Sequence, residues 1–211
     1  TSQNPDRTNY RSEILNQNDG SFYDINISYL HQFNQDGHEL TAELDHDVWD
    51  GDGVTTSEDL NLSGDIIRGS KSEEFGRSRE YEFQLEYVYP HGENRKFEAG
   101  YEVESERSEE STRQLRYNTN REAYSLQEEY SYSTVNDENT QSVYSLYSNE
   151  INSFGYQLGL RGEYTYRDIS RPDSGAYFNL DRWDYFPTLH LSYSFEGPQQ
   201  VMASYRRRID R

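Results

Sequence analysis

The chain has no cysteine, one methionine and five prolines among its 211 residues. Without cysteine it can form neither a disulfide nor a thiolate metal site, and cysteine usage indicates no compartment. It contains no run of about 18 apolar residues, so we expect no transmembrane helix. The opening TSQNPDRTNYRSE lacks the basic, apolar and small-residue succession of a signal peptide. We therefore expect such a peptide to be absent or removed.

Basic residues are also scarce: 20 Lys and Arg stand against 39 Asp and Glu, for a net charge of −19. This balance argues against nucleic acid as a partner, because phosphate binding needs a basic stripe. Only 32% of the residues are hydrophobic, yet 15% are aromatic and 20 are Tyr. Disordered chains are poor in aromatics, so the composition favours a folded chain with one apolar face per strand. We predict a single segment over residues 1–211.

The clearest pattern lies in the last thirty residues. Leu189, Leu191 and Tyr193 alternate with polar residues, and the alternation resumes at Val201 after Glu196-Gly197-Pro198-Gln199. A period of two places one apolar and one polar face on an extended strand. Two such runs joined by a Gly-Pro turn predict a β-hairpin.

The same pattern recurs along the chain and predicts an all-β, antiparallel meander of about eight long strands arranged in hairpins. Turn signals predict short connections at 34–37, 91–94, 151–153 and 196–199. Polar, weakly patterned stretches predict long loops at 51–77, 108–139 and 169–182. We expect residues 1–21 to be irregular or a strand extension.

Alternation of short turns and long loops is typical of outer-membrane barrels. The expected strands of about 10–15 residues are long enough for the roughly 9–11 tilted residues that a bilayer requires. We therefore predict part of a transmembrane β-barrel with one face toward lipid and the other toward the lumen. The lipid-facing candidates are Tyr81, Phe83, Leu85, Tyr87, Tyr156, Leu158, Leu160, Leu189, Leu191 and Tyr193. The lumen-facing candidates are Glu82, Glu86, Glu98, Glu102, Arg161, Glu163, Arg206 and Arg208.

Three stretches carry a family resemblance: YEFQLEYVYPHGENRKFEAGYE, FGYQLGLRGEYTYRD and YFPTLHLSYSF with the closing VMASYRRRIDR. They resemble the barrel of TonB-dependent outer-membrane receptors, most closely the type abundant in Bacteroidota, over roughly residues 22–211. The resemblance implies a barrel of about 22 strands with an N-terminal plug. It also implies import of a large nutrient (a metal chelate, glycan or peptide) through the Gram-negative outer membrane, with TonB coupling in the full-length protein. About eight strands would form part of that barrel, and no plug or TonB-contacting segment is visible.

Candidate chemical sites are weak. A ladder of glutamates suggests paired catalytic carboxylates, but equivalent carboxylates on one strand face are more typical of a solvated surface. Asp50 and Asp52 are candidate oxygen ligands for calcium, although the spacing is not that of an EF-hand. The five histidines show no ligand spacing. We predict no enzyme activity, no catalytic residues and no cofactor.

Arg206, Arg207 and Arg208 form a basic cluster near the end of the chain. Alternation places Arg206 and Arg208 on the polar face, and Arg207 on the apolar face, where it could reach anionic lipid headgroups or lipopolysaccharide phosphate. The expected partners are outer-membrane lipid, lipopolysaccharide and an unknown nutrient. Two alternatives remain open. One is a soluble or surface β-sheet module that binds a partner or glycan. The other is a small barrel enzyme, which would need a rim nucleophile.

Overall fold

The computed structural model describes residues 9–207, and nearly all of them lie in one antiparallel sheet. The sheet order is β1-β2-β3-β4-β6-β7-β8-β9, with the short β5 paired to the end of β4. The strands are β1 (Arg11–Gln32), β2 (Glu39–Leu60), β3 (Ile66–Pro90), β4 (Arg95–Asn118), β5 (Ala123–Leu126), β6 (Tyr132–Ile151), β7 (Phe154–Arg171), β8 (Ala176–Ser194) and β9 (Gln200–Arg206). A single 3-10 turn, η1 (Glu128–Tyr130), follows β5. The all-β meander is confirmed, and β5 brings the described strands to nine.

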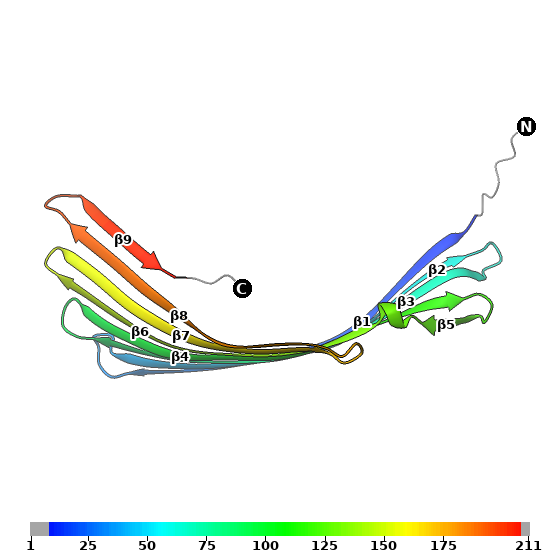
Figure 1. Ribbon diagram of the computed structural model, residues 1–211, viewed down its shortest axis with the longest axis horizontal. Helices are drawn as coiled ribbons and strands as arrows, with labels where there is room; N and C mark the ends of the chain where they lie inside the picture. The colour runs from blue at the N-terminus through cyan, green and yellow to red at the C-terminus, as the bar shows by residue number, and fades with distance from the viewer. Residues whose placement is uncertain (1–8, 208–211) are drawn as a thin grey trace, which may run out of the picture.

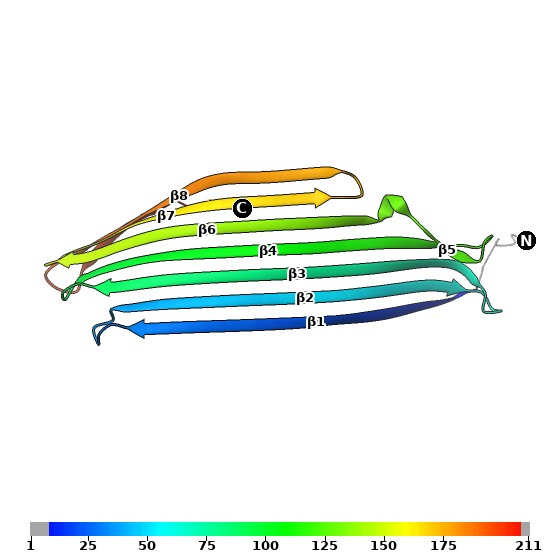
Figure 2. The same cartoon turned by 90° about the horizontal axis from the view of Figure 1, so that it is seen from below.

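All four predicted short turns are present, and they lie together at one end of the sheet (Figure 2). Gly37 has φ of +82° and Asn152 has φ of +56°. These left-handed conformations close the hairpins, and glycine and asparagine adopt them more easily than other residues do.

The predicted long loops are wrong. Most residues of 51–77 and 169–182 extend β2, β3, β7 and β8, and the chain turns only at 61–65 and 172–175. In 108–139, β4 continues to Asn118 and β6 starts at Tyr132, so only the piece that holds β5 and η1 leaves the main meander. Residues 11–21 belong to β1, which confirms the strand extension there, while residues 1–8 lie outside the described part.

The sheet is a single curved layer. Figure 1 shows the two ends of the strands rising toward the same side, so the sheet has a concave and a convex face. Among the described residues only one apolar side chain is buried, that of Leu60, which is 8% exposed. Within residues 9–207 no second layer supplies a core. Backbone pairing and contacts within each face therefore hold these residues together.

Both edges of the sheet lack a partner strand in the described part of the chain. Every residue of β1 is exposed, and β1 pairs only with β2. At the other edge, β9 pairs with β8 only from Thr188 to Ser194. The sheet is consequently an open wall and not a closed barrel.

Candidate functional site

Strand register places all the predicted lipid-facing residues on one face. Leu85 pairs with Tyr101 and Tyr101 pairs with Val143, so the same face continues across β3, β4 and β6. Through Val143 and Gly162 it reaches β7, where alternate residues include Leu158 and Leu160. Because directly paired residues share a face, all ten candidates lie together.

The predicted lumen-facing residues lie on the opposite face. Glu86 pairs with Gly100, and Gly100 pairs with Tyr144 and so connects to Arg161. Glu82, Glu98, Glu102, Glu163 and Arg206 follow by alternation. Arg208 lies outside the described residues.

The chirality of the chain determines which face is convex. The N–H of Phe33 donates to the carbonyl of His38, so the odd residues of β1 hydrogen-bond toward β2. For an L-residue whose side chain points at the viewer on a strand running upward, the N–H and C=O point to the right. With β1 upward, β2 therefore lies to the right when the apolar face is viewed. Figure 2, the view from the convex side, shows this order. The apolar face is convex and the polar face is concave.

The apolar residues of the convex face form a continuous strip, which we call the apolar band. It consists of alternate residues within Tyr23–Tyr29 of β1, Leu40–Val48 of β2, Tyr81–Tyr89 of β3, Phe97–Val103 of β4, Val143–Tyr147 of β6, Tyr156–Leu160 of β7, Tyr185–Tyr193 of β8 and Val201–Tyr205 of β9. Its side chains are open to solvent; Leu160 is 53% exposed. The band thus lacks any protein cover in the described structure.

The band crosses the sheet obliquely. In β1 the band residue furthest from the short turns is Tyr23, and its pairing row crosses β3 at Arg79. In β9 the band residue furthest from the short turns is Tyr205, and its pairing row crosses β3 at Tyr89. The edge of the band therefore shifts by ten residues, at about 3.4 Å each, along the strands while it crosses seven strand spacings of about 4.8 Å. The two lengths are about equal, so the strands are tilted by about 45° from the normal to the band. Strands of outer-membrane barrels are tilted by about 35–45°.

His46 is the one histidine within the apolar band, and its polar atoms are accommodated locally. Its ring stacks on Tyr81 with centroids 4.0 Å apart, and Nδ1 lies 2.9 Å from the carbonyl oxygen of Glu80. This arrangement reduces the number of unpaired polar atoms that His46 presents on the apolar face.

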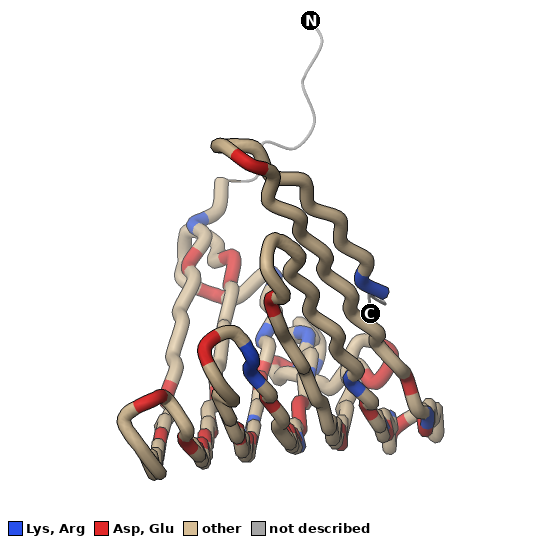
Figure 3. The backbone as a smooth tube through the Cα atoms, turned by 90° about the vertical axis from the view of Figure 1, so that its left-hand side faces the viewer, with Lys and Arg blue, Asp and Glu red and all other residues tan. Residues whose placement is uncertain are grey.

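The concave face is rich in carboxylates, and Figure 3 shows acidic positions recurring on successive strands. One pairing row consists of acidic residues on five neighbouring strands, Asp24, Asp47, Glu80, Glu106 and Glu138. It ends at Arg167, whose Nε donates to Glu138 at 2.8 Å. Like charges opposite each other are unfavourable across a sheet, so such a row requires water or a cationic partner.

Arg161 is the centre of a second concave group. Its Nη1 lies 2.6 Å from Glu102 Oε2, its Nη2 donates to Ser142 Oγ at 2.6 Å, and its Nε lies 3.4 Å from Glu163. The guanidinium connects β4, β6 and β7. The predicted lumen residues Glu102, Arg161 and Glu163 are therefore brought together.

The weak metal candidates do not form a cluster. Asp50 and Asp52 lie on β2 and not in a loop, and Asp50 accepts a hydrogen bond from Arg77 Nη2 at 2.6 Å. Within residues 9–207, no group of three or more His, Asp or Glu side chains is arranged to hold a metal. The same residues contain no helix long and apolar enough to cross a membrane.

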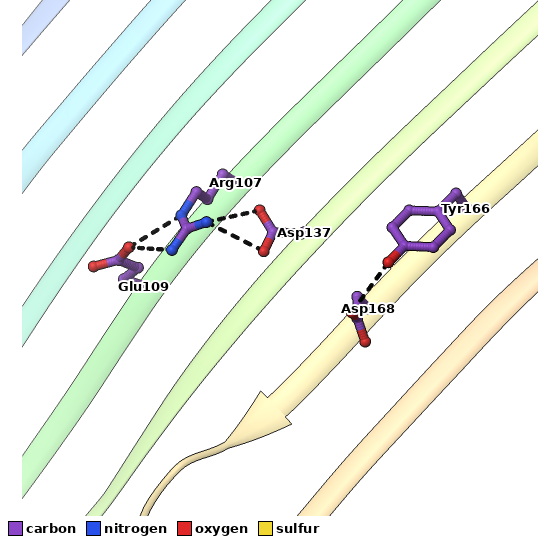
Figure 4. A network of polar contacts seen from close by, with 5 residues as sticks. All are labelled: Arg107, Glu109, Asp137, Tyr166 and Asp168. Carbon is purple, nitrogen blue, oxygen red and sulfur yellow. Dashed lines mark hydrogen bonds and ion pairs between the residues drawn. The ribbon is translucent and has the colours of Figure 1, made fainter.

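Sequence reasoning missed a second charged group, on the convex face at one or more positions beyond the apolar band. Arg107 donates to Glu109 at 3.0 Å and lies 3.4 Å from Asp137, and on the neighbouring strand Tyr166 donates to Asp168 at 3.1 Å (Figure 4). The signal that could have found it is the alternation itself, which continues from Tyr81 to Arg79 and so places charged residues on the same face as the apolar ones.

Comparison with solved structures gives a likeness in part of the sheet. The unliganded ferric citrate transporter FecA superposes with a TM-score of 0.44 at 12% identity, over 79% of this chain and 26% of that one. The chain spans about a quarter of that protein's length. A search of curated protein sequences gives no match.

The sequence profile of the outer membrane protein beta-barrel family matches residues 31–211. This range contains β2 to β9 and most of the apolar band. The family is one of outer-membrane proteins, in agreement with the tilted band and the polar concave face. The chain belongs to the outer membrane protein beta-barrel family.

Proposed function

We propose that this chain forms part of the wall of an outer-membrane transport barrel. The apolar band contacts lipid, and the concave face lines an aqueous lumen. The observation that carries this proposal is the oblique course of the band, which gives a strand tilt of about 45°. In β3 the band covers Tyr81–Tyr89. Nine residues at about 3.4 Å and that tilt cross about 20 Å, close to the apolar height of such barrels.

The finer proposal is a TonB-dependent receptor that imports a large nutrient, with the plug and TonB partner supplied in the full-length protein. The family resemblance of residues 22–211 supports it. An acidic concave wall is also suited to a partner or cargo with basic groups. We assign no catalytic role, because the concave carboxylates form rows of similar groups and lack a distinct acid and base.

Neighbouring residues on opposite faces test the orientation. In the full-length protein reconstituted into lipid vesicles, Leu85→Cys and Glu86→Cys would each carry a fluorescent label. This chain has no cysteine, and any cysteine elsewhere in the full-length protein would first be replaced by serine, so that only position 85 or 86 is labelled. We expect brominated lipid to quench the label at position 85 and aqueous iodide to quench the label at position 86. Aqueous quenching at both positions would instead support a soluble sheet module.

TonB coupling has its own test. The purified periplasmic domain of TonB, mixed with the full-length protein in detergent, should elute with it in size-exclusion chromatography. Separate elution at micromolar concentrations would argue against TonB coupling and would leave the barrel orientation unaffected.

A further inference from the structure

We propose that Arg77, Arg79 and Arg107 form a binding site for the phosphate of a lipid headgroup on the convex face of β3 and β4. This inference rests on the proposed function, because it requires the apolar band to lie in lipid. It adds a site, a ligand chemistry and a position in the bilayer that neither the family match nor the barrel orientation specifies.

The position of the three arginines is set by register. Arg79 is the next convex residue beyond Tyr81, where the apolar band ends in β3, and it pairs directly with Arg107. Arg77 lies two residues further along the same strand. Residues that follow the end of an apolar band lie at headgroup level when the band spans the acyl chains. The site is therefore at the depth of lipid phosphates.

Arg79 has no ion pair or side-chain hydrogen bond within residues 9–207, and its side chain is exposed. Its two neighbours are held by carboxylates. Arg77 donates twice to Asp50, at 2.9 and 2.6 Å, and Arg107 donates twice to Glu109, at 3.1 and 3.0 Å. These contacts fix Arg77 and Arg107 and neutralise much of their charge, while Arg79 retains its full charge and all its donors.

A small hollow of about 50 Å³ is lined by Arg77, Arg79, Arg107 and Glu109. Arg79 and Arg107 occupy directly paired positions, and since Glu109 and Asp137 already compensate much of the Arg107 charge, Arg79 is the guanidinium that still needs an anion. Guanidinium groups present several N–H donors in a plane and bind phosphate oxygens in pairs. A phosphate at the hollow would supply the anion that Arg79 lacks.

The side of the membrane identifies the lipid. Beyond the band, β3 continues from Arg79 back to Ile66, whereas at the other end it stops at Pro90, one residue past Tyr89. Outer-membrane barrels are short on the periplasmic side and extend on the extracellular side. The three arginines therefore face the outer leaflet, and the phosphate they fit is that of lipopolysaccharide.

The test measures lipid A binding to the full-length protein by native mass spectrometry in detergent. We expect Arg79→Gln to weaken binding of bisphosphorylated lipid A about fivefold to tenfold, consistent with the contribution of one basic residue at a membrane surface. Arg79→Lys should lose less affinity for lipid A than Arg79→Gln, because the positive charge remains. Arg113→Gln, on the same face of β4 but further from the band, is the matched control and should bind like the native protein.

Equal lipid A binding by Arg79→Gln and the native protein would overturn the site, as would an equal loss in Arg113→Gln. If the native protein bound dephosphorylated lipid A as tightly as bisphosphorylated lipid A, phosphate would not be the recognised group. If millimolar inorganic phosphate displaced lipid A completely, the site would be one for free phosphate. The labels at positions 85 and 86 separate the two proposals, since lipid contact at 85 with no effect of Arg79→Gln refutes only the headgroup site.

Discussion

Trp49 lies across Gly76 on the concave face, and its ring occupies the space that a side chain at Gly76 would need. A Cβ built on Gly76 would come within 2.4 Å of the Trp49 ring. The same ring lies 2.9 Å from the corresponding position on Gly51. Glycines on β2 and β3 thus make room for one large aromatic side chain on the inner surface of the wall.

Gly76→Ala should therefore destabilise the protein by about 1–3 kcal/mol, the usual cost of overpacking. Urea unfolding in vesicles would measure the change. Gly162→Ala is the control, because its Cβ would meet Tyr185 at an ordinary 3.5 Å. Adding Trp49→Leu to Gly76→Ala should recover most of the loss. No recovery in the double variant would show that Trp49 is not the cause.

Arg161→Met should destabilise the wall because it leaves Glu102 without its cation. Glu102 Oε2 lies 2.6 Å from Arg161, and the two side chains are 25% and 34% exposed. Leaving a polar group without its partner lowers the free energy of unfolding by about 1–3 kcal/mol, and we expect a value near about 1 kcal/mol because both side chains are partly exposed. Arg11→Met removes a more exposed pair, in which Arg11 and Glu13 are 72% and 51% exposed, and should change the free energy of unfolding by less than about 1 kcal/mol. Equal effects of the two substitutions would contradict the assignment.

Acid should loosen the strand ends beyond the apolar band through Glu73. A hydrogen bond from Lys71, followed by the charges of Lys71 and Arg113, lowers the pKa of Glu73. A lowered pKa contributes stability above the ordinary carboxyl value, and this stability is lost as pH falls through the lowered one. The protection of amides at the far ends of β3 and β4 against hydrogen exchange, corrected for the slower intrinsic exchange at low pH, should fall as the pH falls from about 5 to about 3. The loss of protection should be smaller in Glu73→Gln; an identical pH profile in that variant would refute the role of Glu73.

Tyr124→Phe should release β5 from the sheet. The Tyr124 hydroxyl donates to Glu58 Oε1 at 2.6 Å, a contact between β5 and β2. Hydrogen bonds to charged groups contribute about 1.5–3 kcal/mol, so opening of this hairpin should become at least about tenfold more frequent. Trypsin cleavage after Arg121, in the exposed turn before β5, would report it. Tyr117→Phe is the control, because within residues 9–207 its hydroxyl makes no hydrogen bond.

The same contact predicts an effect of alkaline pH. Burial and the Glu58 carboxylate raise the pKa of Tyr124 above its ordinary value. A raised pKa contributes stability below the ordinary tyrosine value, and this is lost as pH rises through the raised one. Cleavage after Arg121 in the native protein should therefore approach the Tyr124→Phe rate only well above pH 10, the ordinary tyrosine range.

Alternation predicted the sheet and its faces because the membrane-level part of each strand has one polar and one apolar side. Tyr81, Phe83 and Leu85 carried that signal. The signal fails beyond the band, where both faces are polar: Glu73 and Glu74 are neighbours on opposite faces of β3. Backbone pairing continues there without any periodicity in hydrophobicity, so residues 51–77 looked like a loop. The arginine hollow depends on which residues of β3 and β4 are paired, and the sequence does not state that register.

The unpaired outer edge of β1 has a consequence for how such a wall is assembled. Along that edge every second residue directs its N–H and C=O away from the sheet. In hydrocarbon each unsatisfied group costs several kcal/mol, so the wall cannot enter a bilayer with that edge bare. A neighbouring strand must reach β1 before or during insertion, and until then the edge is open to any extended segment, including that of a second copy. The order of steps in the biogenesis of this protein is therefore constrained: the edge of β1 must be paired by the time it is buried in lipid.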